Sequence, residues 1–151
     1  MNSSIESIRK TRTYLLTQLD GLTTTQFNIV PEGFNNNIAW NLGHLVAAEQ
    51  GVCYMRGGLK PVIDPAFFER YKPGSRPDEA ISEEAITEIK SLMMSTLDRL
   101  QEDYDEGAFA HYTTWTTRYG TTLASIDEAL AFLLFHEGFH GGICLALKKI
   151  V

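Results

Sequence analysis

Four segments of the chain repeat apolar residues at the three- and four-residue spacing of an amphipathic helix. They run from about residue 3 to 22, 37 to 56, 82 to 104 and 125 almost to the C-terminus. Their apolar positions are Ile5, Ile8, Leu15, Leu19 and Leu22; Ile38, Leu42, Leu45 and Val52; Ile86, Ile89, Met93, Leu97 and Leu100; and Ala129, Leu133, Ile143 and Leu147. The pattern predicts four helices, each with one buried face.

Polar residues and glycines mark the expected ends of these helices. Ser3 and Ser125 are each followed three residues later by a glutamate, which is the spacing of a capping box. Ser82 precedes two glutamates, whose charges suit the positive end of a helix. The pair Gly57-Gly58 predicts the end of the second helix.

The connections between the helices predict how the helices are joined. Residues 57–81 hold four of the five prolines and therefore cannot form one regular element. At about 3.3 Å per residue this segment can span more than the length of a helix, so the second and third helices can run parallel. Residues 105–124 are rich in threonine and predict a short extended piece. We expect one all-α domain over residues 1–151, a four-helix bundle with a long crossover between helices two and three.

Composition narrows the class of protein. The chain has 151 residues, 44% of them hydrophobic, which suits one domain with a real core. Its net charge of −6 argues against nucleic-acid binding, which needs clustered positive charge. The longest apolar run has seven residues, so no membrane-spanning segment is expected. The N-terminus has no signal-peptide pattern, and a cytoplasmic location is expected. Cys53 and Cys144 are expected to be reduced core thiols, with a disulfide left open.

The run His136-Glu137-Gly138-Phe139-His140 places two histidines on one helix face, one turn apart. Both lie in the apolar stripe of the fourth helix, where each ring nitrogen needs a partner, and one metal ion would serve both rings. The run also fits the zinc-protease pattern H-E-x-x-H. Only 11 residues follow His140, and none is His, Asp or Glu. The lack of a downstream third ligand and of a predicted sheet weighs against a peptidase.

A third histidine, His44, lies in the middle of the second helix. Three of the four histidines lie at mid-helix positions, and this placement predicts that they converge on one metal site. Each of them taken alone would more simply be a hydrogen-bonded core residue. Three imidazoles leave coordination positions for water or substrate, as catalytic sites do. His111, in the threonine-rich segment, is expected at the surface.

These residues resemble the DinB/YfiT-like superfamily. The matching segments are residues 38–45, residues 136–143 and the loop at residues 67–75, and with the helix order the resemblance covers essentially the whole chain. It implies a four-helix bundle of up-down-down-up order, a divalent metal ion held by His44, His136 and His140, and a homodimer. Relatives often carry Arg-Gly-Gln after the last histidine; here Gly141-Gly142-Ile143 stands in its place, so any substrate-binding role of that Arg or Gln is vacant.

Two functions follow from the resemblance and the histidines. The first is a metal-dependent enzyme that activates a thiol or water, a thiol S-transferase or hydrolase acting on a small molecule, with a low-molecular-weight thiol as one reactant. Glu137 is then a candidate base or a hydrogen-bond partner of a metal-bound water, with a solvent-facing or salt-bridged glutamate as the alternative. Trp40 is a candidate substrate contact. The second is a non-catalytic stress-response bundle that binds a metal or ligand. Zinc, nickel and iron all suit three imidazoles.

Overall fold

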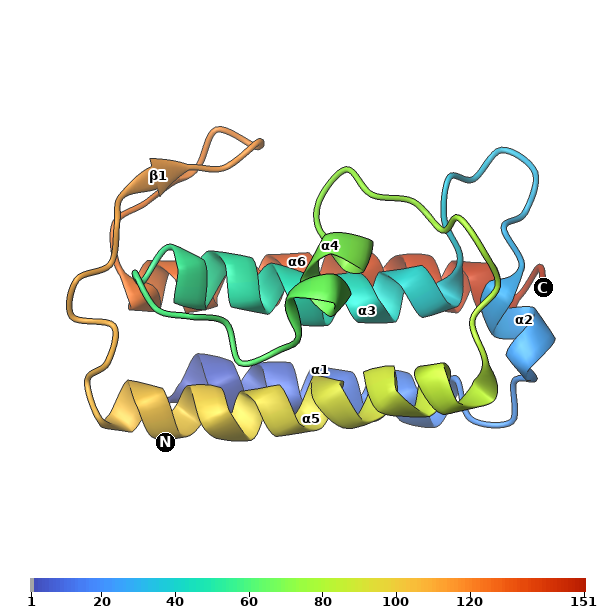
Figure 1. Cartoon of the computed structure of the whole chain (residues 1–151), viewed down its shortest axis with the longest axis horizontal. Coiled ribbons are helices and arrows are strands. Elements are labelled where there is room, and N and C mark those ends of the chain that lie inside the picture. The colour runs from blue at the N-terminus through green and yellow to red at the C-terminus, as the bar shows by residue number, and fades with distance from the viewer. Residues whose placement is uncertain (1) are drawn as a thin grey trace.

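Four long helices lie side by side along the long axis of the molecule (Figure 1). The computed structural model describes residues 2–151. The long helices are α1 (Ser3–Gln18), α3 (Ile38–Glu49), α5 (Glu83–Asp105) and α6 (Ile126–Lys148). Each packs against two others, through the pairs α1–α6, α6–α3, α3–α5 and α5–α1. The chain is mostly helical, and the all-α prediction is confirmed.

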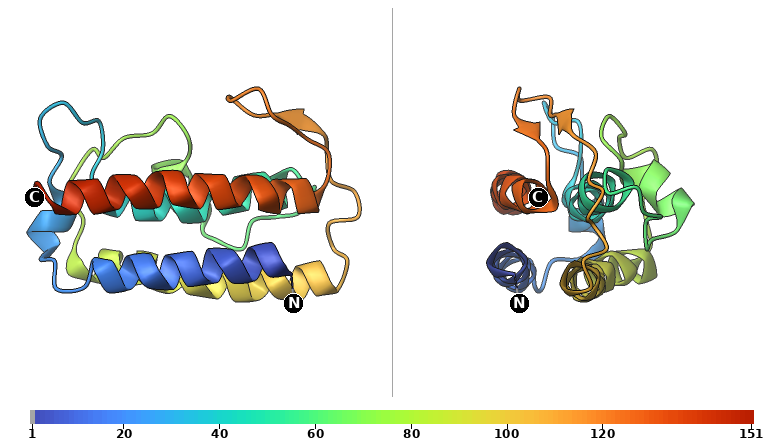
Figure 2. Two further views of the ribbon diagram at one scale, coloured as in Figure 1. Left: turned by 180° about the vertical axis from the view of Figure 1, so that it is seen from behind. Right: turned by 90° about the vertical axis from the view of Figure 1, so that its left-hand side faces the viewer.

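The connections hold four short elements. α2 (Thr24–Asn28) follows α1, and α4 (Pro65–Tyr71) interrupts the proline-rich segment and packs on the outer side of α3 (Figure 2). Two-residue strands, β1 (Trp115–Thr116) and β2 (Thr122–Leu123), pair antiparallel in the threonine-rich segment, which was expected to be extended. The hairpin that they form rises from one end of the bundle and leans back over α3 and α6 in all three views (Figures 1 and 2).

The apolar stripes predicted from the sequence face the core. All of their members are buried except Leu22 and Ile143, which are half-buried. Cys53 and Cys144 are buried free thiols, as expected. α6 is long and apolar enough to cross a membrane by length and composition alone. Its packing against α1 and α3 instead gives it the role of a core helix of the bundle.

The helix starts agree with the sequence at two of three places. Ser82 caps α5, and the Ser125 side chain accepts a hydrogen bond from the Glu128 N–H at 3.2 Å. The capping box at Ser3 was wrong: Asn2 is the cap, and its side chain accepts from the two N–H groups that follow Ser3. An asparagine carbonyl fills the same role as a serine hydroxyl, so the helix begins one residue earlier.

The second predicted helix changes its winding midway. α3 ends at Glu49 and continues as a π-helix, η1 (Gln50–Met55). The change from α- to π-helix occurs at two consecutive polar residues, Glu49 and Gln50, which are both fully buried. The Gln50 amide donates to the Glu49 carboxylate at 2.9 Å, and its carbonyl oxygen accepts from the Val62 N–H at 2.8 Å. Such turns often occur at functional sites in helices, and this one lies next to the buried charges described below.

Candidate metal centre

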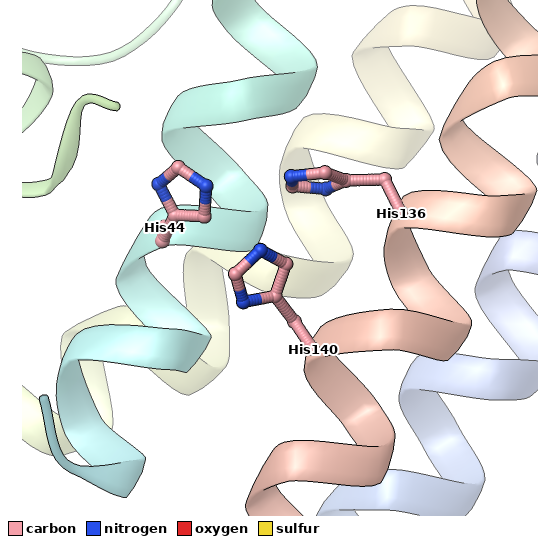
Figure 3. Close-up of side chains that lie close together, drawn as sticks. All are labelled: His44, His136 and His140. Carbon is pink, nitrogen blue, oxygen red and sulfur yellow. The ribbon is translucent and has the colours of Figure 1, made fainter. Parts of the chain in front are cut away.

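Three histidines converge between α3 and α6. His44 comes from α3, and His136 and His140 come from successive turns of α6 (Figure 3). One nitrogen from each ring lies within 4.8 Å of the others, and the ring centroids are 4.5 to 5.1 Å apart. All three residues are buried, whereas His111 is exposed. The convergence predicted from the sequence is confirmed, and the cluster can hold a metal ion.

A glycine allows the crossover to orient His44. A Cβ atom on Gly43 would lie 2.5 to 2.8 Å from ring atoms of Tyr71, so only glycine lets α4 approach α3 so closely. The carbonyl oxygen of Tyr71 then accepts a hydrogen bond from His44 Nδ1 at 2.8 Å. A carbonyl cannot donate, so Nδ1 carries the proton and Nε2 keeps its lone pair.

Asn41 fixes His140 in the same way. The Asn41 amide nitrogen donates to the Asn36 side-chain oxygen at 3.0 Å and to the Asn37 carbonyl at 2.8 Å. These bonds use both N–H groups, and they settle which side-chain atom is oxygen. That oxygen lies 2.8 Å from His140 Nδ1 and must accept. His140 therefore also presents the lone pair of Nε2, the arrangement found in metal sites whose histidines are oriented by outer hydrogen bonds.

His136 differs from the other two histidines. Its Nδ1 atom is buried and has no hydrogen-bond partner among residues 2–151. A buried polar atom without a partner is costly, and its presence beside two oriented imidazoles fits a ring that is held by a ligand. Three neutral imidazoles with few other donors suit a divalent ion that keeps open positions for water or substrate.

The electrostatics of the cluster favour neutral rings. Burial, followed by the neighbouring imidazoles, lowers the pKa of His136 to about 2. Burial, followed by the neighbouring imidazole of His44, lowers the pKa of His140 to about 3. Burial also lowers the pKa of His44, although the hydrogen bond to Tyr71 opposes the shift. The rings are therefore unprotonated at neutral pH, and a metal ion need not displace protons from them.

Trp40, a candidate substrate contact, forms one wall of the cluster. Its ring stacks on His44 at 4.6 Å with an angle of 10° between the planes, and its indole N–H donates to the Ser75 hydroxyl at 3.0 Å. Only 7% of its surface is exposed. The contact holds the imidazole plane of His44 from one side, while Tyr71 holds its edge.

Glu137, the candidate base, lies in the bundle core with Arg12. Its Oε1 accepts from Arg12 Nη2 at 2.6 Å and from Arg12 Nε at 3.1 Å, whereas its Oε2 is buried without a hydrogen-bond partner among residues 2–151. Arg12 Nη1 donates to Glu49 at 2.8 Å. The carboxylate is therefore salt-bridged, which was one of the two alternatives to a base.

This buried charge cluster, Arg12, Glu49 and Glu137, was missed from the sequence. Burial opposes the charge on Arg12, but the two carboxylates outweigh it and raise its pKa. Burial raises the pKa of Glu49, although Arg12 opposes that shift. The sequence did contain an indication of this cluster, because Arg12 falls in the apolar stripe between Ile8 and Leu15. A charged residue at such a position is buried only if it is paired.

Comparison with known proteins agrees with the resemblance. A sequence model described as the DinB superfamily matches residues 7–144, a range that includes His44, His136 and His140. A search of curated proteins gave no significant match.

Proposed function

Because the chain belongs to the DinB superfamily, we propose that it is a divalent-metal-dependent enzyme whose three histidines activate a thiol or a water molecule. The reaction would be thiol transfer to an electrophile or a hydrolysis. The single observation that carries this proposal is the geometry of His44, His136 and His140, with nitrogens within 4.8 Å of one another. The proposed fold is the up-down-down-up bundle; in Figure 1, α1 and α6 run in one direction and α3 and α5 in the other, which supports it.

The residues around the site suit this chemistry. Zinc, nickel or iron bound there would act as a Lewis acid and lower the pKa of a thiol or water. Tyr71 and Asn41 keep Nε2 of His44 and His140 unprotonated and directed into the site. Trp40 covers one side of the cluster and restricts the access of bulk water. The ion pair with Arg12 supports a positioning role for Glu137, which links the helix turn of His136 to the core.

The first test is the metal content of the purified protein. Elemental analysis of the wild type should find about one divalent ion per chain. His44→Ala should lose most of it, because His44 supplies one of the three nitrogens from a different helix. His111→Ala is the matched control, since His111 is exposed and outside the cluster, and it should retain the metal. Full retention of the metal by His44→Ala would contradict the three-histidine site.

The second test is turnover. Metal-loaded wild type and His111→Ala should consume a low-molecular-weight thiol in the presence of a model electrophile, or hydrolyse an activated ester. His136→Ala should be at the background rate. If the wild type binds one metal ion per chain but is no faster than His136→Ala with several thiols and esters, the protein is the non-catalytic metal-binding bundle. The homodimer and the cytoplasmic location remain predictions.

A further inference from the structure

The outer face of α6, formed by its exposed positions between residues 129 and 147, is entirely apolar. Each of these positions is Ala, Leu, Phe or Gly, and the one charged residue in this range, Glu137, is buried. Phe135 is 50% exposed, Phe139 47% and Leu134 37%. α5 has the same length of 23 residues, yet every exposed position on it is polar or charged. The outer side of a surface helix is normally polar, as it is in α5, so the outer face of α6 is expected to be covered by a partner.

The outer face of α6 is open to solvent in a single copy of the chain. In the left view of Figure 2, α6 and α1 lie nearest the viewer, and no other element of residues 2–151 crosses in front of α6. The hairpin lies beside this face, where the Tyr119 ring meets Phe135 edge to face at 5.2 Å. An open cavity of about 550 Å³ separates the hairpin from the first half of α6, and of the described residues that line it only Glu128 is charged. Ala131 and Phe135 belong both to the cavity lining and to the outer face, so the two form one apolar surface.

Opposite charges lie at the two ends of this surface. Glu128 is in the first turn of α6, where one carboxylate oxygen accepts from the Ala124 N–H at 2.6 Å. Lys149 follows the last turn and is exposed. Neither residue forms an ion pair with any residue between 2 and 151. Gly138 lies midway between them, and a Cβ atom on it would have open space for 4 Å among the described residues, so another backbone can approach there.

Such a surface is complementary to itself when a second copy is related to it by a twofold axis. A twofold axis near Gly138 makes the two α6 helices antiparallel. Glu128 of each copy then lies beside Lys149 of the other copy. Phe135 and Phe139 pack on the apolar middle of the opposite helix. A parallel pair would instead bring like charges together at both ends, so the charges favour the antiparallel pair.

The same arrangement brings the C-terminal turn of the second copy over the cavity. Glu128 lines the cavity, and Lys149 of the second copy lies opposite Glu128. Ile150, the next residue, is 57% exposed within its own chain. In the antiparallel pair this isoleucine is placed over the apolar lining of the cavity. An open apolar cavity and an exposed apolar side chain therefore cover each other, and burial of both favours association.

We propose that the outer face of α6 is a homodimer interface, in which two α6 helices pack antiparallel and the C-terminal turn of each copy closes the cavity of the other. A helix of 23 residues is about 35 Å long and about 10 Å wide, so the two helices alone bury only roughly 700 Å². The hairpin and the C-terminal turn add to this area, and the total is at the low end for a specific interface. The dimer should therefore be reversible, with a Kd of roughly 1–100 μM. It does not depend on metal binding or turnover.

Sedimentation equilibrium with a chelator present should show a monomer–dimer equilibrium of the wild type in this concentration range. Phe135→Glu should raise the Kd about 100-fold or more, because it places an unpaired charge inside the interface. The matched control Val62→Glu alters a 43% exposed apolar residue of the crossover, which lies on the far side of α3 from α6 (Figure 2), and should change the Kd less than about twofold. A wild type that stays monomeric would overturn the proposal. If it then floats with phosphatidylcholine vesicles and Phe135→Glu does not, the face binds a membrane surface instead.

Charge reversal tests which ends of the two helices meet. Glu128→Lys and Lys149→Glu should each raise the Kd about fivefold at low salt, because each turns two attractive contacts of the symmetric dimer into repulsive ones. The variant with both changes should return to within about twofold of the wild type. This recovery also separates the charge effect from any loss of the Glu128 contact at the start of α6. Single reversals that leave the Kd unchanged would contradict the antiparallel pair.

Cross-linking gives an independent measure of the same arrangement. The variant Ala131→Cys, Ala146→Cys should be joined into a covalent dimer by a short bismaleimide, because the two positions lie at opposite ends of the antiparallel face. Ala131→Cys alone should not, because its two copies lie about 20 Å apart along the helices. The native thiols of Cys53 and Cys144 are buried and should not react. Equal cross-linking of both variants would overturn the arrangement.

Discussion

Replacing Arg12 by methionine should be among the most damaging single changes to the stability of this protein. The Arg12 side chain is fully buried and makes five hydrogen bonds, to Glu137, Glu49 and the carbonyl oxygens of Met93 and Leu45. Methionine fills similar space but offers no charge and no donor. Two carboxylates would then share the core without a cation.

The expected loss of stability follows from the two carboxylates that stay buried without a cation. Removing one partner of a buried ion pair costs about 3–5 kcal/mol, because the other charge stays buried and unpaired. A domain of this size has a free energy of unfolding of about 5–15 kcal/mol, so the loss is a large share of it. In melting temperature it corresponds to roughly 6–20 °C. The triple variant Arg12→Met, Glu49→Gln, Glu137→Gln removes all three charges and should recover most of the loss.

Urea unfolding with a chelator present measures these differences without a contribution from metal binding. Arg9→Met is the matched control: it lies on the same helix, but its ion pair with Asp98 is partly exposed to solvent, and such pairs contribute less than about 1 kcal/mol. A cost for Arg12→Met no greater than that for Arg9→Met would refute the reasoning. A triple variant as unstable as the single variant would show that packing, not charge, is what Arg12 supplies.

Three further predictions concern the candidate metal site and the residues that support it. The pKa of His136 in the folded protein lies far below its ordinary value of 6.5, so the free energy of unfolding without metal should fall as the pH drops below 6.5. His136→Gln should make this dependence of the free energy of unfolding on pH shallower by about 1.4 kcal/mol per pH unit, as measured by urea unfolding at several pH values. Asn41→Leu should weaken metal binding about 10- to 100-fold in chelator competition, and Asn41→Asp, which keeps the acceptor oxygen, should lose less; equal losses would contradict an orienting role. Gly43→Ala should cost about 1–3 kcal/mol in urea unfolding because its Cβ meets Tyr71, whereas Gly142→Ala, with open space around it, should not destabilise.

The sequence predicted the helices and two members of the histidine cluster because both depend on local spacing. The i, i+4 pair His136 and His140 lies on one face of any helix, and the apolar stripe around it predicts that the face is buried. The contribution of His44 was harder to predict, because its distance from the other two histidines depends on how α3 packs against α6. Its position in the middle of a helix that must pack against the others was enough to bring it to the same site.

The parts that the sequence did not reveal depend on long-range contacts. The hydrogen bond from His44 to the Tyr71 carbonyl requires the path of the crossover, which no periodicity predicts. The ion pair between Arg12 and Glu137 joins residues 125 positions apart. The sequence predicted a short extended piece within residues 105–124, but not that β1 and β2 pair, because the turn between them is set by two backbone hydrogen bonds and each strand has only two residues.

The meaning of the His-Glu-Gly-Phe-His segment depends on the direction in which each side chain leaves the helix. Successive residues of a helix point about 100° apart, so His136 and Glu137 cannot both face the same site. His136 faces His44 on α3, and Glu137 faces Arg12 in the core. The ion pair therefore fixes the rotation of this turn of α6 about its axis, and with it the direction of the His136 ring. Loss of the pair in Glu137→Ala should thus weaken metal binding without removing a ligand, whereas a base would change turnover at unchanged metal affinity.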